Sequence, residues 1–192
     1  MNIRRVGLTL GAVALAAGIS LLVNTELQAQ DKGKAPAKAG KAKGAAMPVQ
    51  ANLGQLMKGT LYVNSNVIFF AQSTDPKDVK PAAQSSTATD PLQTSYGQWQ
   101  AVENAALAMY EGANLLVLPG RKCANGRDVP INNADWPGFV QGLRDAALES
   151  YKLAQKKDLD AMLDAAEKVS TACANCHDKY RDNAPTLAGR CM

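Results

Sequence analysis

Four stretches of this chain carry apolar side chains at intervals of three and four residues, which is the spacing of an α-helix with one buried face. They cover residues 52–71, 90–117, 133–156 and 158–180. None of them alternates apolar and polar residues with the period of two that predicts a half-buried strand. The segments between them are polar and turn-forming. We therefore predict an all-α fold, an antiparallel four-helix bundle whose core is a usual place for a cofactor.

Residues that cap helices mark where the predicted helices begin. Asn52 and Gln55 have the spacing of an N-cap and its N3 partner. Asp90 precedes Pro91, which is the order of an N-cap acid and a proline at the first helical position. Asp158 follows a short lysine-rich turn and is the predicted cap of the last helix. The connections between these helices are long for a bundle, and we expect them to be ordered.

The first 29 residues have the pattern of a secretory signal peptide. Two arginines precede an apolar run from Val6 to Val23, and Ala29 is a small residue suited to cleavage. This predicts an exported, periplasmic protein. An uncleaved membrane anchor facing the periplasm is the alternative, because the apolar run is just long enough to span a bilayer.

Residues 30–48 form a predicted flexible linker, because this segment has five lysines and no large apolar side chain before Met47. One interpretation is a cationic arm that is attracted to anionic lipid or to an acidic redox partner. The alternative is a solubilising spacer. The chain has a formal net charge of +4. Since the linker alone carries a net +4 and the signal +1, the predicted domain, residues 49–192, is not basic. No nucleic-acid role is indicated.

The strongest chemical signal is Cys173-Ala-Asn-Cys176-His177, which contains the only histidine of the chain. Cys-x-x-Cys-His is the attachment pattern of one covalent c-type haem. Two thiols one helical turn apart can each bond to the same porphyrin, and the adjacent imidazole can bind its iron. A thioredoxin-like dithiol would need a βαβ setting, and a structural zinc site would need four ligands, whereas Cys123 and Cys191 stand alone.

This motif continues as Asp-Lys-Tyr180-Arg181 near the end of a helical bundle, and together these features resemble the class II c-type cytochromes, cytochrome c prime and the c556 type. The resemblance covers about residues 50–185 and is strongest over 173–181. It implies haem on the last helix, the first helix against the other haem face, and homodimers as a common state. It also implies that Arg181 lies near the haem edge and the imidazole, beside Tyr180. The alternative for this pair is a fraying helix end with a solvated cation.

The sixth position on the iron separates two functions. Met57 is similar in placement to the ligand of c556-type proteins, whereas in cytochrome c prime an apolar residue shields this side. Here Leu53, Leu56 or Leu61 would be that shield, with Met57 as ordinary core packing. Ligation by His177 and Met57 favours electron transfer with redox partner proteins. An open position favours binding of nitric oxide or carbon monoxide. An enzyme is not expected, because the one histidine is already committed.

Cys123 and Cys191 remain after haem attachment. An exported compartment permits disulfides, so these cysteines either form a bridge from the long connection to the carboxyl end or stay independent. Trp99 and Trp136 are expected to be core or haem-wall packing.

Overall fold

The computed structural model describes residues 48–184, 186 and 189–191. The predicted signal peptide and all of the predicted linker except residue 48 lie outside the described residues. The described residues fall within the unit Ala45–Met192. Among them, no helix has the length and apolar character needed to cross a membrane.

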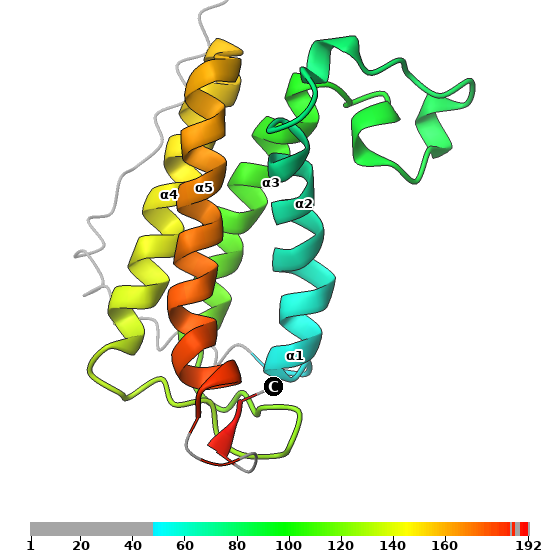
Figure 1. Cartoon of the computed structure of the whole chain (residues 1–192). Coiled ribbons are helices and arrows are strands. Elements are labelled where there is room, and N and C mark those ends of the chain that lie inside the picture. The colour runs from blue at the N-terminus through cyan, green and yellow to red at the C-terminus, as the bar shows by residue number, and fades with distance from the viewer. Residues whose placement is uncertain (1–47, 185, 187–188, 192) are drawn as a thin grey trace, which may run out of the picture. The chain divides into compact units, whose positions relative to one another are not determined.

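Four helical segments account for most of the described chain, and the longest of their helices run side by side (Figure 1). The first joins α1 (Leu53–Leu56), the π-helical turn η1 (Met57–Leu61) and α2 (Tyr62–Phe70); the second is α3 (Trp99–Gly112), continued by the 3-10 turn η5 (Ala113–Val117); the third is α4 (Trp136–Lys156); the fourth is α5 (Leu159–His177), continued by the π-helical turn η6 (Asp178–Asp182). The described residues form no strand, only an isolated bridge between Lys122 and Asp128. The all-α prediction is confirmed.

Two of the predicted helix starts are confirmed by their capping hydrogen bonds. The Asn52 side chain accepts from the Gln55 backbone N–H at 2.8 Å, and the Gln55 side chain accepts from the Asn52 N–H at 2.9 Å. The Asp158 carboxylate accepts from the Ala161 N–H at 3.1 Å and caps α5. Lys157 lies between α4 and α5 in the left-handed conformation, with φ of 57°, which ends α4 and leads directly to the cap of α5.

The predicted start of the second helix at Asp90 is wrong. Asp90 caps only a 3-10 turn, η4 (Pro91–Gln93), and α3 begins at Trp99. Between them the chain folds back so tightly that a Cβ on Gly97 would lie 2.2 Å from the Leu92 carbonyl oxygen. Gln98 then has a φ of 56°. An acid followed by proline satisfies the first N–H groups of any short turn, so the pattern does not require a full helix.

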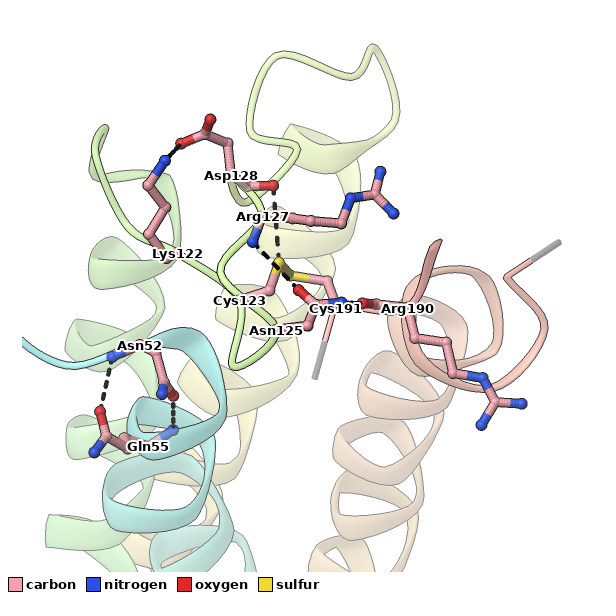
Figure 2. Close-up of a disulfide and its surroundings, with 9 residues drawn as sticks. All are labelled: Asn52, Gln55, Lys122, Cys123, Asn125, Arg127, Asp128, Arg190 and Cys191. Carbon is pink, nitrogen blue, oxygen red and sulfur yellow. Dashed lines mark hydrogen bonds and ion pairs between the residues drawn. A yellow bond between two sulfur atoms is a disulfide. The ribbon is translucent and has the colours of Figure 1, made fainter. Parts of the chain in front are cut away.

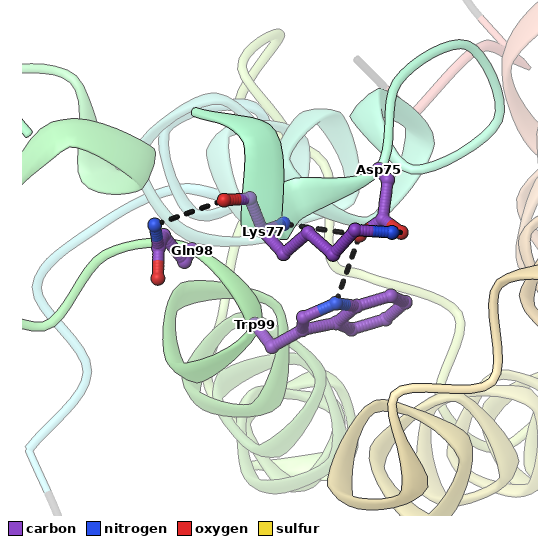
Figure 3. Close-up of polar contacts among 4 residues, drawn as sticks. All are labelled: Asp75, Lys77, Gln98 and Trp99. Atoms are coloured by element: carbon purple, nitrogen blue, oxygen red, sulfur yellow. Dashed lines mark hydrogen bonds and ion pairs between the residues drawn. The ribbon is translucent and has the colours of Figure 1, made fainter. Parts of the chain in front are cut away.

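The connection from residue 72 to 98 is therefore longer than predicted, and it is ordered by side-chain hydrogen bonds (Figure 3). The Gln98 amide donates to the carbonyls of Lys77 and Val79, both at 3.1 Å. The Trp99 indole N–H donates to the Asp75 carboxylate at 3.0 Å. These bonds fix the connection against the start of α3.

The core is built from small and large apolar side chains on adjoining helices. α3 packs against α2 and α4, and α4 packs against α5. Alanines at zero exposure, among them Ala147 on α4 and Ala166 on α5, let two helices approach closely. Trp99 and Trp136 are buried, as predicted, and the Trp136 indole donates to the Leu116 carbonyl at 3.1 Å.

Candidate functional site

A cavity of about 600 Å³ lies among the first helical segment, the start of α4 and the end of α5. Its volume is in the range of small-molecule and cofactor pockets. Most of its wall is apolar. The side chains that line it include Leu53, Met57, Leu61, Tyr62 and Phe69 from the first segment, Trp136, Phe139, Val140 and Leu143 from α4, and Cys173, Cys176, His177, Tyr180 and Arg181 from the last segment.

Every site residue predicted from the sequence lines this one cavity. Cys173, Cys176 and His177 share a face of α5, because residues three and four apart are neighbours on a helix. All three are half-buried, and both thiols are free. The last turn of α5 therefore presents two sulfurs and one imidazole to the same space.

Burial favours the uncharged form of these three side chains. It raises the pKa of the Cys173 thiol, against the opposing charge of Arg181. It raises the pKa of the Cys176 thiol to about 11, and the charges of Cys173 and Asp135 add to that rise. Burial also lowers the pKa of His177, and the positive charge of Arg181 lowers it further. A neutral imidazole keeps the nitrogen lone pair that binds a metal.

Met57 reaches the cavity from the first helical segment, at the start of the π-helical turn η1. Single π turns inside α-helices are frequent at functional sites. Of the three leucines considered as a shield, Leu53 and Leu61 line the cavity with Met57, whereas Leu56 is buried elsewhere. The Met57 thioether therefore faces the cavity together with two of the three leucines.

The π turn was not predicted, although Gly112 of α3 lies close to it. A Cβ on Gly112 of α3 would come within 3.3 Å of both Thr60 and Leu61. The missing side chain at Gly112 thus makes room for the widened turn. Glycine is unfavourable inside a helix, but its presence does not by itself mark a close approach, since a Cβ on Gly59, Gly138 or Gly142 would meet nothing within 4 Å.

Tyr180 is held by the start of α4. Its hydroxyl donates to the Asp135 carboxylate at 2.7 Å and accepts from the Asn133 amide at 3.0 Å. Its ring meets those of Trp136 and Phe139 edge-on, with centroids 5.0 and 6.1 Å apart. Tyr180 is therefore both a cavity wall and an anchor between the last helical segment and α4.

Asp135 supports this site through Tyr180, and the sequence did not single it out. It also pairs with Lys179. The hydrogen bonds from Lys179 and Tyr180 lower its pKa, the lysine having the larger effect. The only sequence signal was its place at the start of the third predicted helix.

Arg181 lies in the last helical turn, η6, beside the cavity. It lines the cavity, and its positive charge lowers the pKa of the Cys173 thiol and of His177. Its guanidinium is also exposed and makes two hydrogen bonds of 2.7 Å to the neighbouring Asp182. A cation thus lies at the rim of the cavity.

Cys123 and Cys191 form a disulfide, with their Cα atoms 4.9 Å apart (Figure 2). Of the two alternatives for these cysteines, the bridge is the correct one. Cys191 and the neighbouring Ala124 also line the cavity. Since both sulfurs are bonded to each other, they are not available as zinc ligands.

Within the described part of the chain, no group of three or more His, Cys, Asp or Glu residues is arranged to hold a metal ion.

Comparisons of this chain with protein-family models, curated proteins and solved structures found no match. The function is therefore inferred from the residues of the cavity.

Proposed function

We propose that this chain is an exported, periplasmic c-type cytochrome that transfers electrons. One haem is bound covalently through Cys173 and Cys176, and its iron is ligated by His177 and Met57. The observation that carries this proposal is that these four side chains, from two helical segments far apart in the sequence, line one apolar cavity.

The donor set and the walls of the cavity fit this cofactor. Neutral thiols suit thioether formation, in which each sulfur bonds to a vinyl carbon and its proton goes to the neighbouring carbon. The apolar walls, Leu53 and Leu61 among them, would keep water away from the bound cofactor. Haem supplies an iron that gains and loses one electron.

The two proposed ligands have separate roles. His177 contributes the neutral imidazole that its lowered pKa favours. Met57 contributes an uncharged thioether, and methionine ligation raises the reduction potential relative to other axial ligands. Arg181 at the rim favours negative charge, such as that of a carboxylate on the cofactor.

The test is the absorption spectrum of the oxidised and reduced holoprotein, with and without carbon monoxide, for the parent and for Met57→Leu. We expect the parent to be low-spin and insensitive to carbon monoxide, and Met57→Leu to be high-spin and to bind the gas. Met162→Leu is the matched control, since Met162 has zero exposure in the core and is not among the cavity-lining residues. A parent protein that is high-spin and binds carbon monoxide would instead favour the gas-binding function.

A further inference from the structure

The connection between α3 and α4 touches both helical segments that carry the proposed iron ligands. We use the name clamp loop for its residues 121–128. On the side of Met57, the Lys122 carbonyl accepts from the Leu53 N–H at 2.8 Å. The Arg121 guanidinium donates to the Ala51 carbonyl at 2.6 Å. The clamp loop therefore holds the start of α1, one turn before Met57.

Arg121 is an unusual anchor because it is 6% exposed. A buried charge is costly unless it is hydrogen-bonded. The guanidinium donates to two main-chain carbonyls, that of Ala51 and that of Leu115, the latter at 3.3 Å. The guanidinium thus joins the end of the α3 segment to the residues that precede α1.

On the side of His177, the clamp loop is joined to the carboxyl-terminal segment by a covalent bond and a hydrogen bond (Figure 2). Cys123 is bonded to Cys191. The Asn125 amide donates to the Arg190 carbonyl at 2.5 Å. The Cys191 N–H donates to the Tyr180 carbonyl at 2.8 Å, and Tyr180 lies one turn beyond His177. The disulfide thus fixes the clamp loop to the end of the helix that carries the imidazole.

We propose that the clamp loop, through Arg121 and the Cys123–Cys191 disulfide, sets the separation between Met57 and His177 and so keeps the thioether on the iron. This inference rests on the proposed function. The cavity lies between the two helical segments, and ligand geometry has to be held within about 0.5 Å. A covalent link across the end of the cavity supplies that constraint. Arg121, Cys123 and Cys191 are therefore positioning residues.

The experiment compares holoprotein carrying both Cys123→Ser and Cys191→Ser with the parent, by two measurements. The first is hydrogen exchange of the Leu53 and Cys191 amides, which reports on the clamp loop without reference to the iron. We expect both amides to exchange faster in the variant. The second is carbon monoxide binding. If the fraction with Met57 dissociated rises from about 1% to about 10%, the apparent affinity for the gas rises about tenfold.

Trp99→Phe is the matched control. It removes the indole hydrogen bond to Asp75, 3.0 Å long, at the other end of the first helical segment (Figure 3). We expect it to leave the exchange of both amides and the carbon monoxide affinity unchanged. Arg121→Met is a second variant that keeps the disulfide. It should speed exchange at Leu53 more than at Cys191, and it should also raise the affinity for the gas.

The outcomes separate the two proposals. A parent that is high-spin before the gas is added overturns Met57 ligation, and the ligand-positioning role with it. A six-coordinate parent whose variants show unchanged gas affinity overturns the clamp loop alone. If the cysteine variant does not fold, Arg121→Met decides by the same criteria.

Discussion

Removing the disulfide should cost this domain about 4 kcal/mol of its free energy of unfolding. Cys123 and Cys191 are 68 residues apart in the sequence. For a loop of that length, the chain-entropy relation gives a loss of about 15 cal/mol/K in the unfolded state, or about 4.4 kcal/mol at 25 °C. The two cysteines are buried, at 2% and 9% exposure, so two serines add a small packing and desolvation cost to the entropic one.

The assay is urea unfolding followed by far-ultraviolet circular dichroism, for the parent and for the variant with both cysteines replaced by serine, in the same cofactor state. In thermal unfolding of a domain of this size, a loss of about 4 kcal/mol corresponds to a fall in Tm of roughly 8–16 °C. The slope of unfolding free energy against urea should rise as well, because an uncrosslinked unfolded chain exposes more surface.

A phosphine reductant supplies the matched control. It should destabilise the parent by a similar amount and leave the serine variant unchanged. A loss below about 1 kcal/mol, or an equal effect of the reductant on both proteins, would refute the view that this bond crosslinks the native fold.

Three further perturbations test other parts of the structure. Trp136→Phe should cost about 2 kcal/mol in urea unfolding, since it leaves the buried Leu116 carbonyl without its 3.1 Å donor; a cost under about 0.5 kcal/mol would contradict that role. Lys157→Gly should raise stability by about 1 kcal/mol in thermal melts, because φ of 57° strains a residue with a Cβ; no gain would argue against the left-handed joint. The hydrogen bond that Asp75 accepts from Lys77 lowers the pKa of the Asp75 carboxyl below its ordinary value of 3.8. The stability that the ionised Asp75 contributes is therefore full above pH 3.8 and is lost as the pH falls through the lowered pKa. The urea midpoint of Asp75→Asn should therefore fall less than that of the parent between pH 5 and pH 2, and parallel curves would rule this out.

The helices were predictable from local sequence because their signals are local. Apolar residues three and four apart, with caps such as Asn52 and Asp158, need no knowledge of the rest of the chain. The failure at Asp90 has a physical reason, since its capping bond is satisfied by a three-residue turn. The fold-back at Gly97 depends on a contact with the Leu92 carbonyl that no period reveals.

The candidate site was predictable only in its chemically distinctive part. Cys173, Cys176 and His177 carry their spacing on one helix, so their shared face follows from the sequence. Contacts between residues that are distant in the chain cannot be predicted from local spacing. The hydrogen bond between Tyr180 and Asp135 spans 45 residues, and the disulfide was one of two alternatives. A π turn of five residues is too short for apolar spacing to distinguish from an α-helix.

The central claim is that Cys173 and Cys176 hold one haem covalently. It is tested most directly by the mass of the protein, exported by a host that attaches c-type haem, under denaturing conditions. We expect the mature chain plus one haem, and loss of that addition when both cysteines are replaced by alanine. A parent with the mass of the unmodified chain would contradict the account.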